Sequence, residues 1–155
     1  NEVSFVFIGD GHLRPLMEAR VKENALENVR IFPRIESRQV AVALSRAKVC
    51  MAALKDDRVL NDLGLSLNKL NDYLYSGKPT VVACNSANVV GASGGGIVVP
   101  CEDAKAYADA LQELFHMSEE ERCRMGEKGR RTIRETYNYA LLAKQYMDIL
   151  SKYTK

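Results

Sequence analysis

The sequence predicts an α/β fold in which a Rossmann-like parallel sheet carries helices on both faces, followed by a helical C-terminal third. Apolar, strand-like runs alternate with segments of helical periodicity over the first two thirds of the chain. These runs are almost entirely apolar, as expected for strands of a parallel sheet that is buried on both faces. The length of 155 residues and the hydrophobic content of 46% match one domain with a single core.

The expected strands are short apolar runs, rich in β-branched residues, that end at glycine, proline or polar residues. They are Val3–Ile8, Val29–Phe32, Lys48–Leu54, Thr80–Cys84 and Ile97–Val99. The helices between them place apolar residues at spacings of three and four. They run from Leu13 to about Ala25, through Val40–Ala47, and from Leu67 to the stop at Gly77-Lys78-Pro79. We expect Asn85–Ser93 to be irregular and Gly94–Gly96 to form a flexible turn.

The last third is predicted to be helical. Asp103 is expected to cap one amphipathic helix, and Ser118 with Glu121 predicts a capping box at the start of a highly charged second one. Gly126 and Gly129 are expected to interrupt this charged helix. Its arginines alternate with glutamates, which favours a solvated, salt-bridged surface over a basic patch. A final amphipathic helix is expected from Tyr139 onward, packed on this domain or on a neighbouring one.

Composition excludes several classes of function. The net charge of +2 gives no electrostatic case for binding nucleic acid or an anionic membrane. The four cysteines are far apart and predict neither a zinc site nor a disulfide framework, which favours a reducing, cytoplasmic compartment. No transmembrane segment or signal peptide is recognisable. Three aspartates, Asp56, Asp57 and Asp62, match no calcium loop and are interpreted as solvated acids.

The helix that follows the polar loop carries the strongest candidate site. Asn68 and Lys69 lie in its first turn, where free N–H groups and the helix dipole favour an anion such as phosphate. Asp72 follows one turn later on the same face, where a carboxylate can accept hydrogen bonds from vicinal hydroxyls. Spacing alone favours an ordinary capped surface helix with a solvated Lys–Asp pair.

In parallel α/β sheets, ligands bind beyond the carboxyl ends of the strands. Four loops are expected there: Gly9–His12, Pro33–Glu36, Lys55–Leu67 and Asn85–Ser93. Gly9-Asp10-Gly11 is similar to the start of a dinucleotide-binding motif, but Arg14 stands where the third glycine belongs. A tight strand-to-helix turn is therefore the favoured interpretation.

A family resemblance joins these motifs. It rests on motifs found in the same order along nearly the whole chain: Phe7-Ile8-Gly9-Asp10-Gly11, Asn28-Val29-Arg30-Ile31-Phe32, Ser66-Leu67-Asn68-Lys69-Leu70-Asn71-Asp72-Tyr73, Gly77-Lys78-Pro79 and Met125-Gly126-Glu127-Lys128-Gly129-Arg130. Together they resemble the C-terminal, donor-binding half of GT-B glycosyltransferases of family 4, in particular the bacterial capsule and O-antigen transferases. The resemblance implies a single Rossmann-like nucleotide-sugar-binding domain over residues 1–155, with an N-terminal acceptor-binding domain outside it.

The resemblance also implies roles for individual residues. Asp72 stands at the second acid of the family's Glu-x7-Glu motif, which binds the ribose hydroxyls, whereas the first acid falls on Gly64. Leu67, Asn68 and Lys69 match a stretch whose amides face the diphosphate, with Leu67 in place of a proline. The loop segment Arg34-Ile35 resembles the part that packs beside the base, and Gly9 and Gly11 join the candidate set as the first loop. The family's first strand and helix, with two cations that clamp the phosphates, would precede Asn1.

The expected function is therefore that of a glycosyltransferase donor domain for a nucleotide diphosphate sugar, most simply a UDP-sugar, in bacterial surface polysaccharide synthesis. No metal, cofactor or nucleic acid is expected to take part, and no catalytic residue is assigned. The isolated chain is expected to be inactive, and the full-length protein to be cytoplasmic or attached peripherally to the inner membrane. Two alternatives stay open: a nucleotide-binding or docking module without transferase activity, and a sugar-nucleotide epimerase of the same architecture.

Overall fold

The computed structural model describes residues 3–56 and 67–153. The chain divides into two compact units, Asn1–Val42 and Ala43–Lys155, here called the N-terminal unit and the C-terminal unit. The boundary between them falls inside helix α2, Ser37–Arg46. Each unit is described by itself.

The N-terminal unit is built on two parallel strands. Strand β1, Phe5–Ile8, and strand β2, Val29–Phe32, pair in register from Phe5 opposite Val29 to Ile8 opposite Phe32. Helix α1, Arg14–Glu23, connects them and begins with Pro15 in its first turn, where a missing N–H costs nothing. No described residue of this unit is fully buried, and Val6 and Ile8 are 53% and 43% exposed. A two-stranded sheet with one connecting helix is too small to cover both of its faces.

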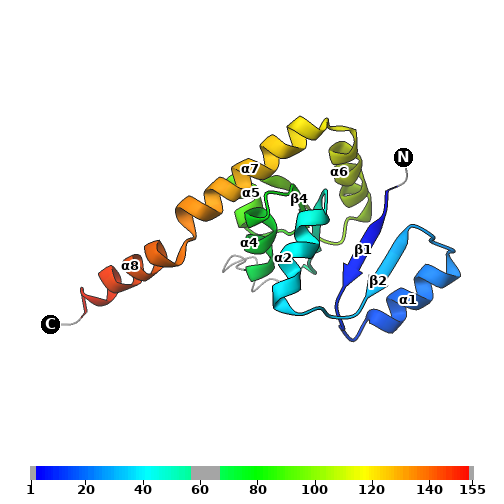
Figure 1. Cartoon of the computed structure of the whole chain (residues 1–155), viewed down its shortest axis with the longest axis horizontal. Coiled ribbons are helices and arrows are strands. Elements are labelled where there is room, and N and C mark those ends of the chain that lie inside the picture. The colour runs from blue at the N-terminus through cyan, green and yellow to red at the C-terminus, as the bar shows by residue number, and fades with distance from the viewer. Residues whose placement is uncertain (1–2, 57–66, 154–155) are drawn as a thin grey trace. The chain divides into compact units, whose positions relative to one another are not determined.

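The C-terminal unit contains a three-stranded parallel sheet in the order β3-β4-β5. Its strands are β3, Cys50–Ala53, β4, Thr80–Ala83, and β5, Gly96–Val99. Helix α4, Asn68–Tyr75, connects β3 to β4, and the short helix α5, Val89–Ser93, connects β4 to β5 (Figure 1). Every residue of the central strand β4 is buried, which explains its uninterrupted β-branched and small apolar sequence.

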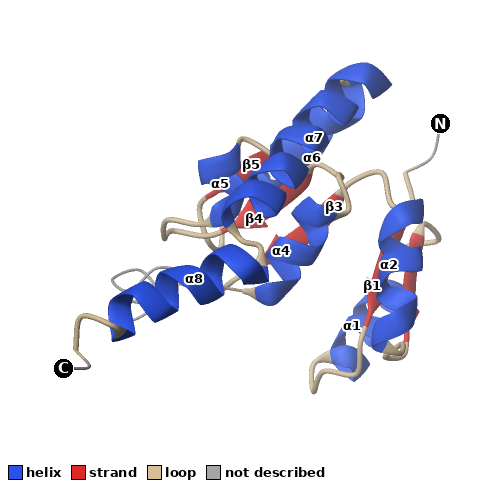
Figure 2. Ribbon diagram, turned by 60° about the vertical axis from the view of Figure 1, so that its left-hand side comes forward, coloured by secondary structure: helices blue, strands red, loops and turns tan. Residues whose placement is uncertain are grey.

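Helices cover both faces of this sheet. On one face Val82 packs with Leu70 and Leu74 of α4, with Val90 of α5 and with Ile133 of α7, which spans Glu119–Thr136. On the other face Val81, Ala83 and Val99 pack with Ala110 and Leu114 of α6, which spans Ala104–His116. Figure 2 shows the strands of this sheet with α4, α5, α6 and α7 around them. The predicted Rossmann-like arrangement is confirmed.

The strands differ from the prediction in how they pair. All five predicted strands form, but the described residues place β1 and β2 in one sheet and the other three in a second. The neighbour of a parallel strand is decided by packing between segments that are distant in the sequence. The apolar sequence of the strand itself does not specify that neighbour. The segment expected to be irregular also contains α5, because Asn88 caps it by accepting hydrogen bonds from the N–H groups of Val90 and Gly91 at 3.1 Å.

The glycines predicted to loosen the structure instead permit close packing. Gly126 and Gly129 are buried inside α7, which continues through both of them. A Cβ on Gly126 would lie 2.0 Å from the carbonyl oxygen of Gly77. A Cβ added to Gly95 would likewise clash with the backbone of Gly129. Gly94 has a φ of 63° and ends α5 in the left-handed conformation. The expected helix interruption is therefore wrong, whereas the expected turn forms at Gly94 and Gly95 but is closely packed, and Gly96 already belongs to β5.

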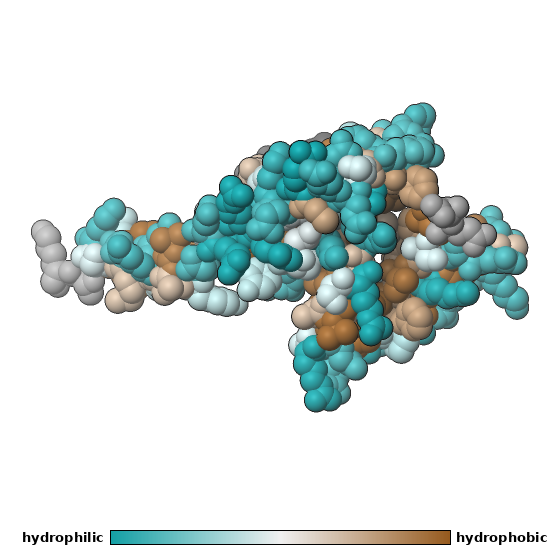
Figure 3. Space-filling view, turned by 45° about the horizontal axis from the view of Figure 1, so that its top comes forward, coloured by the Kyte–Doolittle hydropathy of each residue, from teal (hydrophilic) through white to brown (hydrophobic). Residues whose placement is uncertain are grey.

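The caps predicted for the last third are confirmed. Asp103 accepts a hydrogen bond from the Ala106 N–H at 2.8 Å at the start of α6, and Ser118 and Glu121 form a reciprocal capping box on α7. Helix α8, Tyr139–Leu150, is amphipathic as predicted, but none of its residues is fully buried. Tyr139 and Tyr146 are 93% and 63% exposed, and Figure 3 shows hydrophobic groups on this helix. None of the described helices is long and apolar enough to cross a membrane.

Candidate functional site

The candidate residues of the N-terminal unit gather around Asp10. This residue lies between Gly9 and Gly11 in the loop after β1. Its Oδ2 accepts a hydrogen bond from the backbone N–H of Arg34 at 2.9 Å, in the loop after β2. The N–H of Gly9 donates to the carbonyl of Phe32 at 3.0 Å. The loops after the two strands are thus joined at the carboxyl end of their sheet, where a ligand is expected.

The two glycines leave the backbone of this loop open. A Cβ placed on Gly9 or on Gly11 would meet no other atom within 4 Å. Arg34 is exposed and Ile35 is half-buried in the neighbouring loop. The arrangement offers accessible backbone groups from one loop and an apolar side chain with a cation from the other.

Asp10 is held as an anion by its neighbours. The hydrogen bond from the Arg34 N–H, and secondly the Arg14 guanidinium at 2.5 Å, lower the pKa of the Asp10 carboxyl below its ordinary value of 3.8. A pKa that is lower in the folded than in the unfolded chain means that ionised Asp10 stabilises the fold. That contribution is present above about pH 4 and is lost as the pH falls through the folded value.

Replacing Asp10 with alanine is therefore expected to loosen the junction of the two loops at neutral pH. The Arg34 amide should exchange its hydrogen faster than in the wild type at pH 7, and the difference should shrink as the pH is lowered below 3.8. Amide hydrogen exchange at several pH values measures this, with Glu27→Ala, an exposed acid of the same unit, as the control. Equal exchange in wild type and Asp10→Ala at pH 7 would contradict the assignment.

The candidate residues of the C-terminal unit lie at the amino end of α4. Leu67 precedes the helix in extended conformation and provides no side-chain cap. Among the described residues no side chain accepts a hydrogen bond from the N–H groups of Asn68 and Lys69 in the first turn, where helices bind acceptors from outside. Because α4 connects two parallel strands, its amino end lies at the carboxyl end of the sheet.

Buried leucines hold α4 in place and leave the candidate side chains outside. Leu70 and Leu74 are completely buried against the sheet and α7, whereas Asn68, Lys69 and Asp72 are exposed. No ion pair or side-chain hydrogen bond joins Lys69 or Asp72 to the other described residues, so the solvated Lys–Asp pair considered above does not form in the part of the chain the structure describes. A cation and a carboxylate that have no partner among the described residues are candidates for binding a ligand.

Gly64 and Ser66 lie outside the described residues. Among the residues that are described, no group of three or more His, Cys, Asp or Glu side chains is arranged to hold a metal ion.

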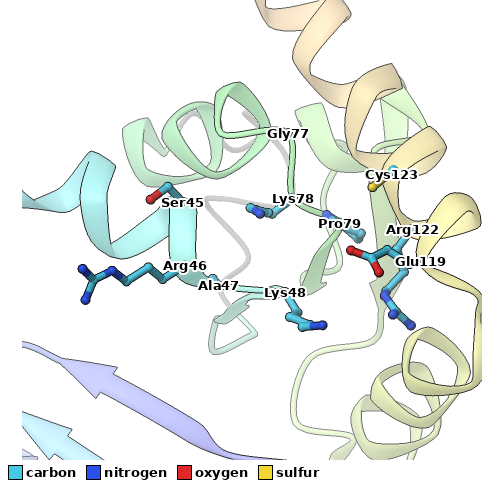
Figure 4. Close-up of a pocket in the computed structure, with 10 residues that line it drawn as sticks. All are labelled: Ser45, Arg46, Ala47, Lys48, Gly77, Lys78, Pro79, Glu119, Arg122 and Cys123. Atoms are coloured by element: carbon cyan, nitrogen blue, oxygen red, sulfur yellow. The ribbon is translucent and has the colours of Figure 1, made fainter.

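A pocket of the C-terminal unit lies away from the predicted site. It has a volume of about 210 Å³ and is lined by Lys48 and Lys78 together with Glu119 and Arg122 from the first turn of α7 (Figure 4). Lys48 and Pro79 come just before β3 and β4, so the pocket lies at the amino ends of these strands. The amino end of α4 is at the opposite end of the sheet, where parallel α/β folds bind ligands.

Sequence reasoning missed two residues that organise these sites. Asp10 was recognised as part of a turn, but its bond to Arg34 depends on the pairing of β1 with β2. Arg130 was counted among solvated charges, yet its guanidinium donates to the carbonyls of Tyr75 and Ser76 at the carboxyl end of α4. The signal for Arg130 was its place in the Met125-Gly126-Glu127-Lys128-Gly129-Arg130 motif, where the glycines bring α7 close to α4.

Comparison with known proteins identifies the family. The family model described as glycosyl transferases group 1 matches residues 1–117, which include all eight candidate binding residues. The chain belongs to the group 1 glycosyl transferases. Helices α7 and α8 follow the region that the family model matches. No curated protein matches the sequence.

A solved structure supports the fold of this glycosyltransferase chain. Sucrose-phosphate synthase (tll1590) from Thermosynechococcus elongatus is similar with a TM-score of 0.76 and 21% sequence identity. The similarity covers 95% of this chain and 37% of the synthase chain, so the chain spans little more than a third of the structure it matches. At this level of identity the comparison establishes the architecture.

Proposed function

We propose that this chain is the donor-binding domain of a GT-B glycosyltransferase of family 4 that uses a nucleotide diphosphate sugar, most simply a UDP-sugar. Leu67, Asn68 and Lys69 bind the diphosphate through helix-terminal amides and one cation, and Asp72 accepts hydrogen bonds from the ribose hydroxyls. The base of the nucleotide packs beside two loops, which contain Gly9, Gly11, Arg34 and Ile35. The acceptor is bound by a separate domain, so that the 155-residue chain alone transfers no sugar.

The observation that carries this proposal is the amino end of α4. An uncapped helix start, an exposed lysine in its first turn and an exposed carboxylate one turn later form a site for a group with an anionic and a hydroxyl-bearing part. A nucleoside diphosphate has both parts. In the transfer reaction the same amides and cation stabilise the departing diphosphate as its charge develops.

We further propose that the full-length enzyme acts in the cytoplasm, or at the inner membrane, in the synthesis of a bacterial surface polysaccharide of the capsule or O-antigen type. The second candidate function is a nucleotide-binding module without transferase activity. The presence of Gly64 favours it, because glycine supplies no carboxylate at the position that the resemblance assigns to the donor sugar. Reconstitution with an acceptor-binding domain and a labelled donor separates the two functions.

Calorimetric titration of the chain with UDP, GDP, uridine and free hexoses tests the proposed donor. UDP is expected to bind more tightly than uridine, because only UDP reaches the amides and Lys69. Free hexoses are expected not to bind measurably. Absence of binding for both nucleoside diphosphates would refute the proposed function.

Replacing Lys69 with alanine is expected to weaken UDP binding more than uridine binding, because the lost charge acts on the diphosphate. The loss should become smaller as salt is raised, since the exposed charge is screened over about 8–10 Å at physiological ionic strength. Titrations at two salt concentrations measure both effects. Lys144→Ala, which removes an equally exposed helical lysine from α8, is the matched control. An equal loss for UDP and uridine would contradict the phosphate assignment.

A further inference from the structure

The carbonyl groups at the carboxyl end of α4 accept hydrogen bonds from an arginine side chain of another helix. Nε of Arg130 donates to the carbonyl of Tyr75 at 3.1 Å, and Nη2 donates to the carbonyl of Ser76 at 2.6 Å. Arg130 belongs to α7, 55 residues further along the chain than Tyr75. These carbonyls are among the last of α4, which have no partner inside the helix and carry its negative partial charge.

The surroundings of Arg130 restrict its position. The guanidinium lies against Gly77, where an added Cβ would come within 2.4 Å of Nη2, and Gly77 itself has a left-handed φ of 74° that ends the helix. Glu127, one turn earlier on α7, contacts Nη1 at 3.5 Å. Gly126 brings α7 into contact with the same turn. The hydrogen bonds to α4 are thus formed by a half-buried side chain with little freedom to move.

Hydrophobic contacts and directional bonds restrain α4 in different ways. Leu70 and Leu74 hold it against the sheet and α7 through apolar contacts, which are not directional. Two hydrogen bonds from the planar guanidinium of Arg130 add a directional restraint on the position and rotation of the helix. A helix of eight residues is about 12 Å long, so a shift at its carboxyl end is transmitted to Asp72 in its middle and to Lys69 in its first turn.

We propose that Arg130 is a positioning residue for donor binding, which acts by setting the register of α4 and not by touching the ligand. The proposal rests on the proposed function for the role of Asp72 and Lys69, whereas the restraint on α4 stands independently of it. Removing the Arg130 guanidinium leaves α4 packed on the sheet but with its position less restrained. Affinity for the nucleotide then falls while the domain stays folded.

The chain contains a matched control in Arg122. Its Nη1 donates to the carbonyls of Leu114 at 3.0 Å and of Phe115 at 3.4 Å, and also to that of Met117, at the carboxyl end of α6. Arg122 thus contacts terminal carbonyls as Arg130 does, but on a helix that carries none of the candidate residues. Loss of Arg122 is expected to lower the melting temperature without weakening nucleotide binding.

The experiment compares Arg130→Ala, Arg130→Lys and Arg122→Ala with the wild type, well below their melting temperatures. Calorimetry with UDP is expected to show a several-fold weaker Kd for Arg130→Ala and a Kd within twofold of wild type for Arg122→Ala. Arg130→Lys keeps the charge but lacks the planar group whose Nε and Nη2 each donate to one carbonyl, so its affinity should remain below that of the wild type. Wild-type affinity in folded Arg130→Ala would overturn the proposal.

Hydrogen exchange of the α4 amides gives a second readout that needs no ligand. Exchange from Leu70 to Leu74 is expected to be faster in Arg130→Ala than in Arg122→Ala, when both are compared at the same interval below their melting temperatures. Equal exchange in the two variants would overturn the role of Arg130. A wild type that binds no UDP would refute the proposed function, and the exchange measurement would still decide whether Arg130 restrains α4.

Discussion

Asp72→Ala is expected to weaken UDP binding by about 1–3 kcal/mol, the range for losing hydrogen bonds to a charged group. This corresponds to roughly a five- to 150-fold higher Kd. The carboxylate is exposed and bonds to none of the other described residues, so it is free to accept from the ribose hydroxyls. For the same reason the free energy of unfolding should change by less than about 0.5 kcal/mol.

Calorimetry with UDP and uridine, alongside thermal melts, separates these effects. Uridine binding should fall by a similar factor, because it carries the same ribose, in contrast to the expectation for Lys69→Ala. Asp72→Glu keeps the carboxylate and is expected to retain binding, while Asp148→Ala removes an exposed helical aspartate from α8 as a control. Unchanged affinity in Asp72→Ala with a normal melt would exclude the ribose contact.

Gly126→Ala is expected to destabilise the C-terminal unit, although alanine is the better helix former. The added Cβ would lie 2.0 Å from the carbonyl oxygen of Gly77 and 2.6 Å from its carbon, and both are backbone atoms. Helix propensity favours alanine over glycine by about 1 kcal/mol. Overpacking against a fixed backbone costs about 1–3 kcal/mol or more, so we expect the packing penalty to exceed the gain.

Chemical denaturation measures this change, and two controls isolate its cause. Gly11→Ala introduces a Cβ that meets no atom within 4 Å, and Arg131→Ala changes an exposed residue of the same helix. Both should leave the midpoint of unfolding almost unchanged. A Gly126→Ala variant as stable as the wild type or more stable would show that α7 does not approach the Gly77 turn as closely as described.

Local signals in the sequence predicted most of the secondary structure. Apolar runs ended by Gly9, Pro33 and Pro100 predicted strands, and the side chains of Asp103 and Ser118 predicted helix starts that the structure confirms. Caps and breakers act within a few residues, so they can be recognised without knowledge of the fold. The helix that these signals missed was α5, which has only five residues and is too short to show helical periodicity, and the glycines of α7 did not interrupt it as predicted.

The sequence by itself also determined which residues form the candidate site on α4. Asn68, Lys69 and Asp72 share one helical face because of their spacing, and the structure leaves all three exposed. The tertiary structure alone decided the partners of Asp10, Gly126 and Arg130. These depend on strand pairing and on helices packed across more than 20 residues of intervening chain, and no local pattern specifies such contacts because their free energy arises only when distant segments meet.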